Sequence, residues 1–217
     1  MGTVDLSLAR RLRQDLRLDR AVETGTYLGI TARRLAEVFP AVVTIELSEQ
    51  LHATAAAALR DVPQVKALQG HSVDRLPEVA DPKRPALYFL DGHWSAGVTV
   101  GANDECPLLR ELSAIGPGNP SDCLIVDDAR LFAAPPPPPH DPAAWPTLLE
   151  VFDAIRSDRP DHHITILEDQ IVAVPQQARA IVDAHGQSLL MREQQPDWRA
   201  RVLALAQAAR DRLRRRR

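Results

Sequence analysis

The feature that most constrains the fold is a regular alternation of strand-like segments with segments of helical spacing. Five short segments have the length and character of strands: residues 21–26, 41–47, 65–70, 86–92 and 123–129. Helical periodicity or composition marks another set of segments: residues 4–18, 30–39, 49–60, 105–115 and 145–158. Strands and helices that alternate in this way predict an α/β fold with a mostly parallel sheet.

A hairpin is expected to close the sheet. Residues 163–175 contain two apolar strand segments with only Gln170 between them, which predicts a tight antiparallel pair. The near-continuous apolar strands are typical of a sheet that helices cover on both faces. The sequence therefore predicts a doubly wound, mostly parallel, seven-stranded sheet with a closing antiparallel hairpin.

The chain length of 217 residues fits one domain that spans residues 1–217. We expect this domain to begin with the helix 4–18 and to end with an Arg-rich helical tail at 197–217. A Pro-rich loop at 133–146 holds seven prolines, and such a loop cannot join a sheet ladder.

Charge and apolar patterning narrow the class of partner. Residues 199–217 hold eight Arg and one Asp, so the other residues carry a net charge of −10. An acidic body disfavours nucleic acid, and no apolar run is long enough to cross a bilayer. The basic tail is a solvated helix end or, alternatively, a dock for an anionic partner. Cys106 and Cys123 form no CxxC or Cys/His metal pattern, so we expect a reducing, cytoplasmic compartment.

Ligands of open α/β sheets bind beyond the carboxyl ends of the strands. Polar or acidic residues follow every predicted parallel strand: 23–29, 46, 70–72, 91–95 and 127–130. This repetition favours a binding site at that edge over a set of unrelated turn residues.

The first strand end, VETGTYLGIT, indicates a nucleoside site. Gly25 and Gly29 allow positive φ and a close approach of the backbone to a ligand, and Glu46 stands 21 residues after Gly25. A carboxylate at that spacing can accept both hydroxyls of a ribose. The turn lacks the middle glycine of a pyrophosphate-binding loop, and the carboxylate of Glu23 would repel a phosphate. Glu23 could instead pair with a cationic amino-acid group or hold the turn.

These motifs, with G-H-S at 70–72 and FLDG at 89–92, are similar to those of class I S-adenosylmethionine-dependent methyltransferases, over residues 20–175. The resemblance implies a Rossmann-like methyltransferase fold and S-adenosylmethionine as cofactor. Glu46 would hold the ribose, and His71 with Ser72 would lie at the adenine edge. The full cofactor set implied is Glu23, Thr24, Gly25, Thr26, Tyr27, Gly29, Thr31, Glu46, Leu47, His71, Ser72, Asp91 and Gly92.

Asp91, Asp127 and Asp128 follow two strands that are expected to be neighbours. Three ionised carboxylates at one place repel unless a cation or proton neutralises them, and an all-oxygen set suits Mg²⁺. This arrangement resembles the metal-dependent, macrocin-type sugar O-methyltransferases, which implies Asp91, Asp127 and Asp128 as metal ligands. The alternative is that Asp127 or Asp128 only caps a loop.

The sequence and the resemblance together predict an S-adenosylmethionine-dependent O-methyltransferase for a small hydroxylated acceptor, with sugars included. Asp91 and His93 are the expected catalytic residues, either of which would remove the proton of the acceptor. We expect a small-molecule acceptor and neither nucleic acid nor a membrane as partner, and a homo-oligomer stays open. The alternatives are a nicotinamide-dependent oxidoreductase and a non-catalytic cofactor-binding or interaction module of the same fold.

Overall fold

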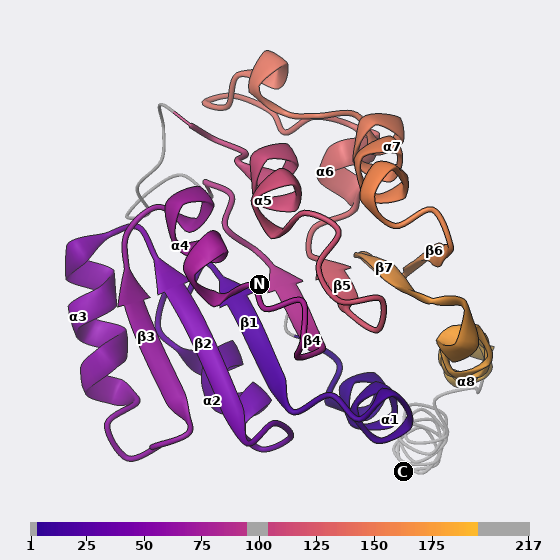
Figure 1. Ribbon diagram of the computed structural model, residues 1–217. Helices are drawn as coiled ribbons and strands as arrows, with labels where there is room; N and C mark the ends of the chain where they lie inside the picture. The colour runs from indigo at the N-terminus through magenta and orange to yellow at the C-terminus, as the bar shows by residue number, and fades with distance from the viewer. Residues whose placement is uncertain (1–3, 95–103, 195–217) are drawn as a thin grey trace, which may run out of the picture. The chain divides into compact units, whose positions relative to one another are not determined.

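A computed structural model of the protein describes residues 4–94 and 104–194 and is built around one β-sheet (Figure 1). Within these residues, seven strands form one sheet in the order β3-β2-β1-β4-β5-β7-β6. Their bounds are β1 (Arg20–Thr24), β2 (Ala41–Glu46), β3 (Val65–Gln69), β4 (Ala86–Leu90), β5 (Cys123–Val126), β6 (His162–Leu167) and β7 (Gln170–Pro175). The first five strands pair in parallel, whereas β7 is antiparallel to both β5 and β6. The predicted fold class is confirmed.

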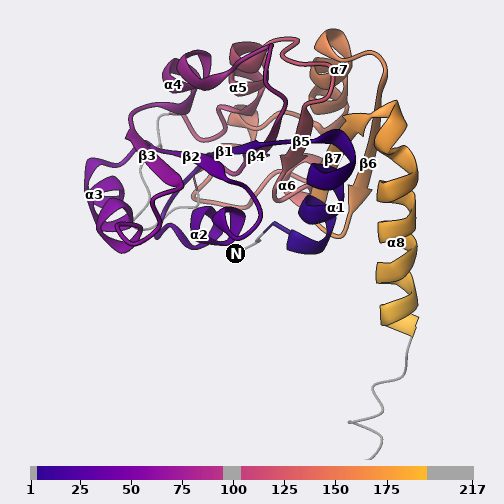
Figure 2. The ribbon, with the colours of Figure 1, turned by 60° about the horizontal axis from the view of Figure 1, so that its bottom comes forward.

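Helices cover both faces of this sheet. Figure 2 shows α4, α5 and α7 on one face and α1, α2 and α3 on the other. The helices are α1 (Leu6–Leu16), α2 (Ile30–Ala36), α3 (Glu49–Ala58), α4 (Ser72–Val79), α5 (Leu108–Ile115), α6 (Arg130–Ala133), α7 (Leu148–Asp158) and α8 (Arg179–Gln194), with 3₁₀ turns η1 (Pro142–Ala144) and η2 (Gln176–Ala178). None of the described helices is long and apolar enough to cross a membrane.

The chain divides into two compact units, with the boundary after Ile181. The unit up to Ile181 contains the whole sheet, and the second, from Val182, is described as helix up to Gln194. The expected tail at 197–217 lies outside the described residues. The site described below belongs entirely to the first unit.

The core of the first unit lies on both sides of β4. All residues of that strand are at most 2% exposed. On one face of the sheet, the apolar sides of α5 and α7 pack over Ala86, Tyr88 and Leu90 through side chains such as Leu112 and Ile155. Each fully buried apolar side chain of this size contributes about 1.5–3 kcal/mol to folding. A rigid central strand therefore fixes the position of its polar carboxyl end.

Local sequence signals explain where the helices begin. The side chain of Asp5 caps α1 by accepting hydrogen bonds from the amides of Ser7 and Leu8. Ser48 caps α3, as its position predicts. Thr147 and Glu150 form a reciprocal capping box at the start of α7.

Several predicted bounds differ from the observed ones. The helix expected at 4–18 spans Leu6–Leu16, because Asp5 caps one end and Arg17 takes a left-handed conformation at the other. The helix expected at 105–115 begins at Leu108, after Pro107 at its N-cap, which leaves Glu105 outside it. In the hairpin the turn lies before Gln170, which pairs with Leu167 in the ladder.

Candidate functional site

The site lies at the carboxyl ends of β1, β2, β4 and β5. The amide of Asp91, just beyond β4, donates to the carbonyl of Thr24 at 3.2 Å, and the amide of Asp127 donates to the carbonyl of Leu90 at 3.1 Å. Residues that are far apart in sequence thus meet at one edge, as the parallel order of the strands predicts.

The turn between β1 and α2 passes directly against the end of β4. Gly25 has φ +83°, and a Cβ atom built on it would lie 2.1 Å from the carbonyl oxygen of Asp91. No side chain fits there, so the first glycine of the motif is required by close packing. Gly29, with φ +76°, starts α2, where Thr31 lies half-buried in the first turn.

Glu46, at the end of β2, is held by backbone amides. Its side chain is 6% exposed, with one oxygen accepting from the amide of Tyr27 and the other from the amide of Ser48, each at 2.9 Å. Each carboxylate oxygen has a further lone pair, so the group is oriented without being saturated. The neighbouring Leu47 is an exposed apolar residue.

Glu23 is a buried carboxyl group at the end of β1. It accepts a 2.6 Å hydrogen bond from the hydroxyl of Thr44, which also lies 2.6 Å from the hydroxyl of Thr26. Burial raises the pKa of Glu23 to about 8, against the opposing effect of Thr44, and the charges of Asp91 and Glu46 add to the rise. Glu23 therefore keeps its proton near neutral pH when no cation faces it.

His71 and Ser72 lie at the end of β3, where they begin α4. The His71 Nδ1 atom accepts from the amide of Val73 at 3.2 Å, and its Nε2 atom lies 2.7 Å from a carboxylate oxygen of Asp104. A nitrogen that accepts leaves the proton on Nε2, so the ring has partners on both sides. A role at the adenine edge stays a prediction for both residues.

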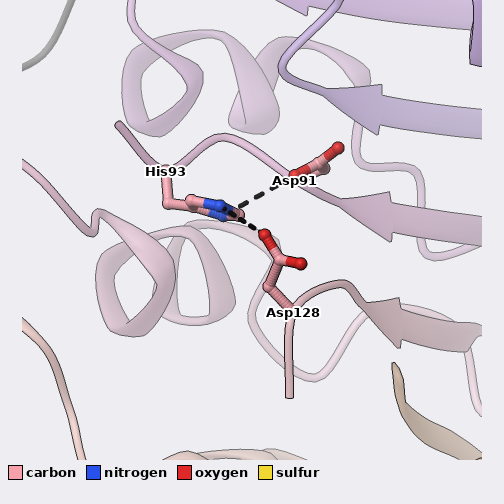
Figure 3. A group of neighbouring side chains, drawn as sticks. All are labelled: Asp91, His93 and Asp128. Carbon is pink, nitrogen blue, oxygen red and sulfur yellow. Dashed lines mark ion pairs between the residues drawn. The ribbon is translucent and has the colours of Figure 1, made fainter. Parts of the chain in front are cut away.

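Asp91, His93 and Asp128 form the centre of the site (Figure 3). His93 Nε2 lies 2.9 Å from an Asp128 oxygen, and Nδ1 lies 3.6 Å from an Asp91 oxygen. One ligand atom from each residue lies within 4.8 Å of the others. Arg130 also pairs with Asp128, at 2.7 Å.

The three groups differ in protonation. Burial raises the pKa of Asp91 to about 7, although the nearby His93 opposes this. The hydrogen bond from His93 is the main cause that lowers the pKa of Asp128 to about 2. Burial alone would lower the pKa of His93, but the two carboxylates together raise it. The site thus places an imidazole whose protonated form the carboxylates favour against one ionised carboxylate, beside a second carboxyl that titrates near neutrality.

Asp127 lies beside this group and acts on the pKa values of Asp91 and His93, but its side chain has another partner. Asp127 is 2% exposed and accepts a hydrogen bond from the side-chain Nε2 of Gln170 at 3.0 Å, and it is not part of the convergent set. Burial raises its pKa. Among the described residues the donors that converge are Asp91, His93 and Asp128, so His93 stands where the sequence suggested Asp127.

Sequence reasoning missed Glu111. It is 1% exposed, and a Cβ atom built on Gly92 would lie 2.7 Å from its Oε1 atom, so the carboxyl lies directly against the Asp91–His93 segment. Burial raises the pKa of Glu111, against hydrogen bonds from Ser72 and Thr24. A signal was present, because Glu111 interrupts the apolar stripe Leu108, Leu112 and Ile115 of α5.

Solved structures show what this fold is similar to. The O-methyltransferase TomG of Streptomyces achromogenes, involved in tomaymycin synthesis and solved with S-adenosylmethionine, is 20% identical, with a TM-score of 0.52 over 80% of this chain and 82% of that one. An O-methyltransferase of Bacillus cereus, solved in complex with SAH, is 17% identical, with a TM-score of 0.54 over 79% of this chain and 82% of that one. No family model and no curated protein matches the chain. The likeness shows that the chain has the fold of class I S-adenosylmethionine-dependent methyltransferases.

Proposed function

We propose that this protein is an S-adenosylmethionine-dependent O-methyltransferase that acts on a small hydroxylated acceptor. The observation that carries the proposal is the contact between two candidate sites. The glycine turn expected to hold the cofactor touches Asp91, the first residue of the acid and histidine cluster. A methyl donor on the turn and an acceptor on the cluster would then meet at one sheet edge.

Each part of the site has a role in this proposal. S-adenosylmethionine supplies an activated methyl group when it is bound. Glu46 accepts hydrogen bonds from the ribose hydroxyls, and Glu23 faces the cationic amino-acid end. When no cation is bound, Asp91 is the candidate general base, because a pKa of about 7 suits proton removal near neutral pH. His93 orients Asp128 and Asp91, and in its neutral form it is the alternative proton acceptor.

The residues present fit a divalent cation. Asp91, His93 and Asp128 offer two carboxylates and one imidazole within a small volume. An ion held there would lower the pKa of an acceptor hydroxyl. Carboxylates suit Mg²⁺ and Mn²⁺, whereas imidazole suits transition metals such as Fe²⁺ and Zn²⁺ better than Mg²⁺. We therefore propose Mn²⁺, a transition metal that carboxylates also suit, in place of the Mg²⁺ suggested by an all-carboxylate set.

The metal proposal is tested by titration of the purified protein with Mn²⁺ and with Mg²⁺ in a calorimeter. We expect Mn²⁺ to bind more tightly, and we expect Asp128→Asn to weaken its binding while Asp127→Asn has a smaller effect. Equal loss in both variants would restore the all-aspartate set. Absence of binding by the folded wild-type protein would remove the metal from the mechanism.

A direct assay tests the activity itself. The protein is incubated with S-adenosylmethionine that carries a labelled methyl group and with a panel of hydroxylated acceptors, sugars first. Asp91→Asn is the inactive control expected from the proposed base. Labelled product from the wild-type protein, but not from Asp91→Asn, would support the proposal. No product across sugars, phenols and other alcohols would point to the non-catalytic alternative.

A further inference from the structure

Glu105 joins two segments beside the candidate site. It is 5% exposed, and its carboxylate accepts three hydrogen bonds: from the indole nitrogen of Trp145 at 2.9 Å, from His140 Nδ1 at 3.1 Å and from the amide of Asp141 at 3.0 Å. Its own carbonyl accepts from the amide of Trp94 at 2.7 Å. One residue therefore ties the end of the Asp91–Trp94 segment to the Pro-rich loop.

Ring contacts lead from this point to the catalytic cluster. The ring of Trp145 is edge-on to the ring of His93, with centroids 5.3 Å apart. His140 lies edge-on to both Trp145 and Trp94, at 5.8 and 4.9 Å. His93 in turn holds Asp128 at 2.9 Å. Direct contacts through Trp145 and His93 therefore join the Glu105 carboxylate to the Asp128 carboxylate.

The charge of Glu105 is compensated within the loop. Burial by itself raises the pKa of a carboxyl, but the hydrogen bonds from Trp145, Asp141 and His140 lower the pKa of Glu105 overall. Three donors aimed at one buried carboxylate form a strong anchor, because each bond to a charged acceptor is stronger than a neutral one. A loop rich in proline, with few backbone donors of its own, depends on such an anchor for its position.

We infer that Glu105 is a positioning residue: it fixes Trp145 against His93 and thereby sets the orientation of the imidazole toward Asp128 and Asp91. Its effect on turnover rests on the proposed function, whereas its effect on His93 does not. If the role of Glu105 were purely structural, its replacement would lower the stability of the protein without changing the shifts of the His93 ring nitrogens.

The test compares three variants: Glu105→Ala, Glu105→Gln and the control Glu150→Gln. Glu150 follows Trp145 in the chain and belongs to the capping box of α7, where Gln is accepted in its place. In ¹H–¹⁵N spectra we expect Glu105→Ala to shift the Trp145 indole resonance and to speed its hydrogen exchange. We expect the ¹⁵N shifts of the His93 ring nitrogens to move toward those of an imidazole free in water at the same pH, because the ring would no longer be held toward Asp128 and Asp91. Glu105→Gln, which keeps an acceptor oxygen, should restore much of both signals, and the control should match the wild-type protein.

A folded Glu105→Ala protein with wild-type His93 shifts would overturn the inference. Should that variant fail to fold, Trp145→Phe removes the same hydrogen bond from the other side, and unchanged His93 shifts there would overturn it equally. SAH affinity and turnover are measured in parallel. Substitution of a residue that orients a ligand side chain from outside typically lowers activity or metal affinity about 10–100-fold. We therefore expect a loss of turnover of this size in Glu105→Ala, with unchanged SAH affinity. A wild-type protein that binds no SAH would contradict the proposed function, while the His93 result would still decide the inference.

Discussion

The atoms next to Gly25 and Gly29 determine whether a side chain can be accommodated at each position of the glycine turn. Gly25 and Gly29 both have left-handed φ, but they differ in their neighbours: a backbone oxygen at Gly25 and the flexible tip of Leu59 at Gly29. Every L-residue pays for such a φ by about 1–2 kcal/mol. Only Gly25 adds a clash that the surroundings cannot relieve.

We therefore predict that Gly25→Ala lowers the free energy of unfolding by about 3 kcal/mol or more, whereas Gly29→Ala costs about 1–2 kcal/mol. Urea denaturation of both variants measures the difference. Equal losses of unfolding free energy in the two variants would mean that the end of β4 can move away from the turn, and that Gly25 does not fix the contact with Asp91.

A second prediction concerns Glu46. Glu46→Ala removes the acceptor for the ribose hydroxyls, so the affinity for SAH should fall by roughly 1.5–3 kcal/mol, the usual range for hydrogen bonds to a charged group. Calorimetry measures the change, and Glu49→Ala, in the first turn of α3, is the control. Wild-type affinity in a folded Glu46→Ala protein would remove Glu46 from the cofactor site.

Glu23 supports a prediction about pH. The unfolded chain releases this proton near the ordinary pKa of 4.5, whereas the folded chain holds it until about 8. The folded state thus binds more protons between these values, and its stability falls as pH rises through the window. Glu23→Gln cannot ionise, so its stability should fall less than that of the wild-type protein between about pH 5 and pH 8. Parallel pH profiles from denaturant unfolding would contradict the raised pKa.

At the scale of elements, strands were easier to predict than helices. The apolar run at β4 and the β-branched run at β2 leave little choice, so their positions follow from sequence alone. Helix α4 was not predicted, because it is short and contains Pro77, and its N-cap is a histidine. The hairpin turn was misplaced because Glu168, not a glycine or asparagine, takes the positive φ of 51°.

The candidate site shows the same division. The residues that end strands were predicted from position, and the structure brings Glu23, Gly25, Glu46 and Asp91 to one edge. Residues that reach the edge from elsewhere, such as Glu105 and Glu111, were missed because their burial depends on tertiary packing. The convergence of His93 with Asp128 likewise depends on a left-handed backbone at Asp128, which no local pattern indicates.

The capping box of α7 gives a prediction at this scale. Thr147 accepts from the amide of Glu150, and Glu150 accepts from the amide of Thr147. Thr147→Ala should lower the free energy of unfolding by about 1 kcal/mol, the typical cost of a lost N-cap. Thr147→Ser keeps the hydroxyl and should remain near the wild-type value in the same denaturation experiment. Equal losses in both variants would show that packing of the threonine methyl, not the cap, carries the effect.

For the molecule as a whole, the central claim is that the edge formed by β2, β1 and β4 binds S-adenosylmethionine. The nicotinamide dinucleotide of the rival oxidoreductase would place its pyrophosphate over a turn that lacks the middle glycine, which the backbone there disfavours. The measurement that separates them is a calorimetric titration of the wild-type protein with SAH and, separately, with NAD⁺. We predict saturable one-to-one binding of SAH and none of NAD⁺, as the central claim requires. Binding of NAD⁺ without SAH by the folded protein would contradict it.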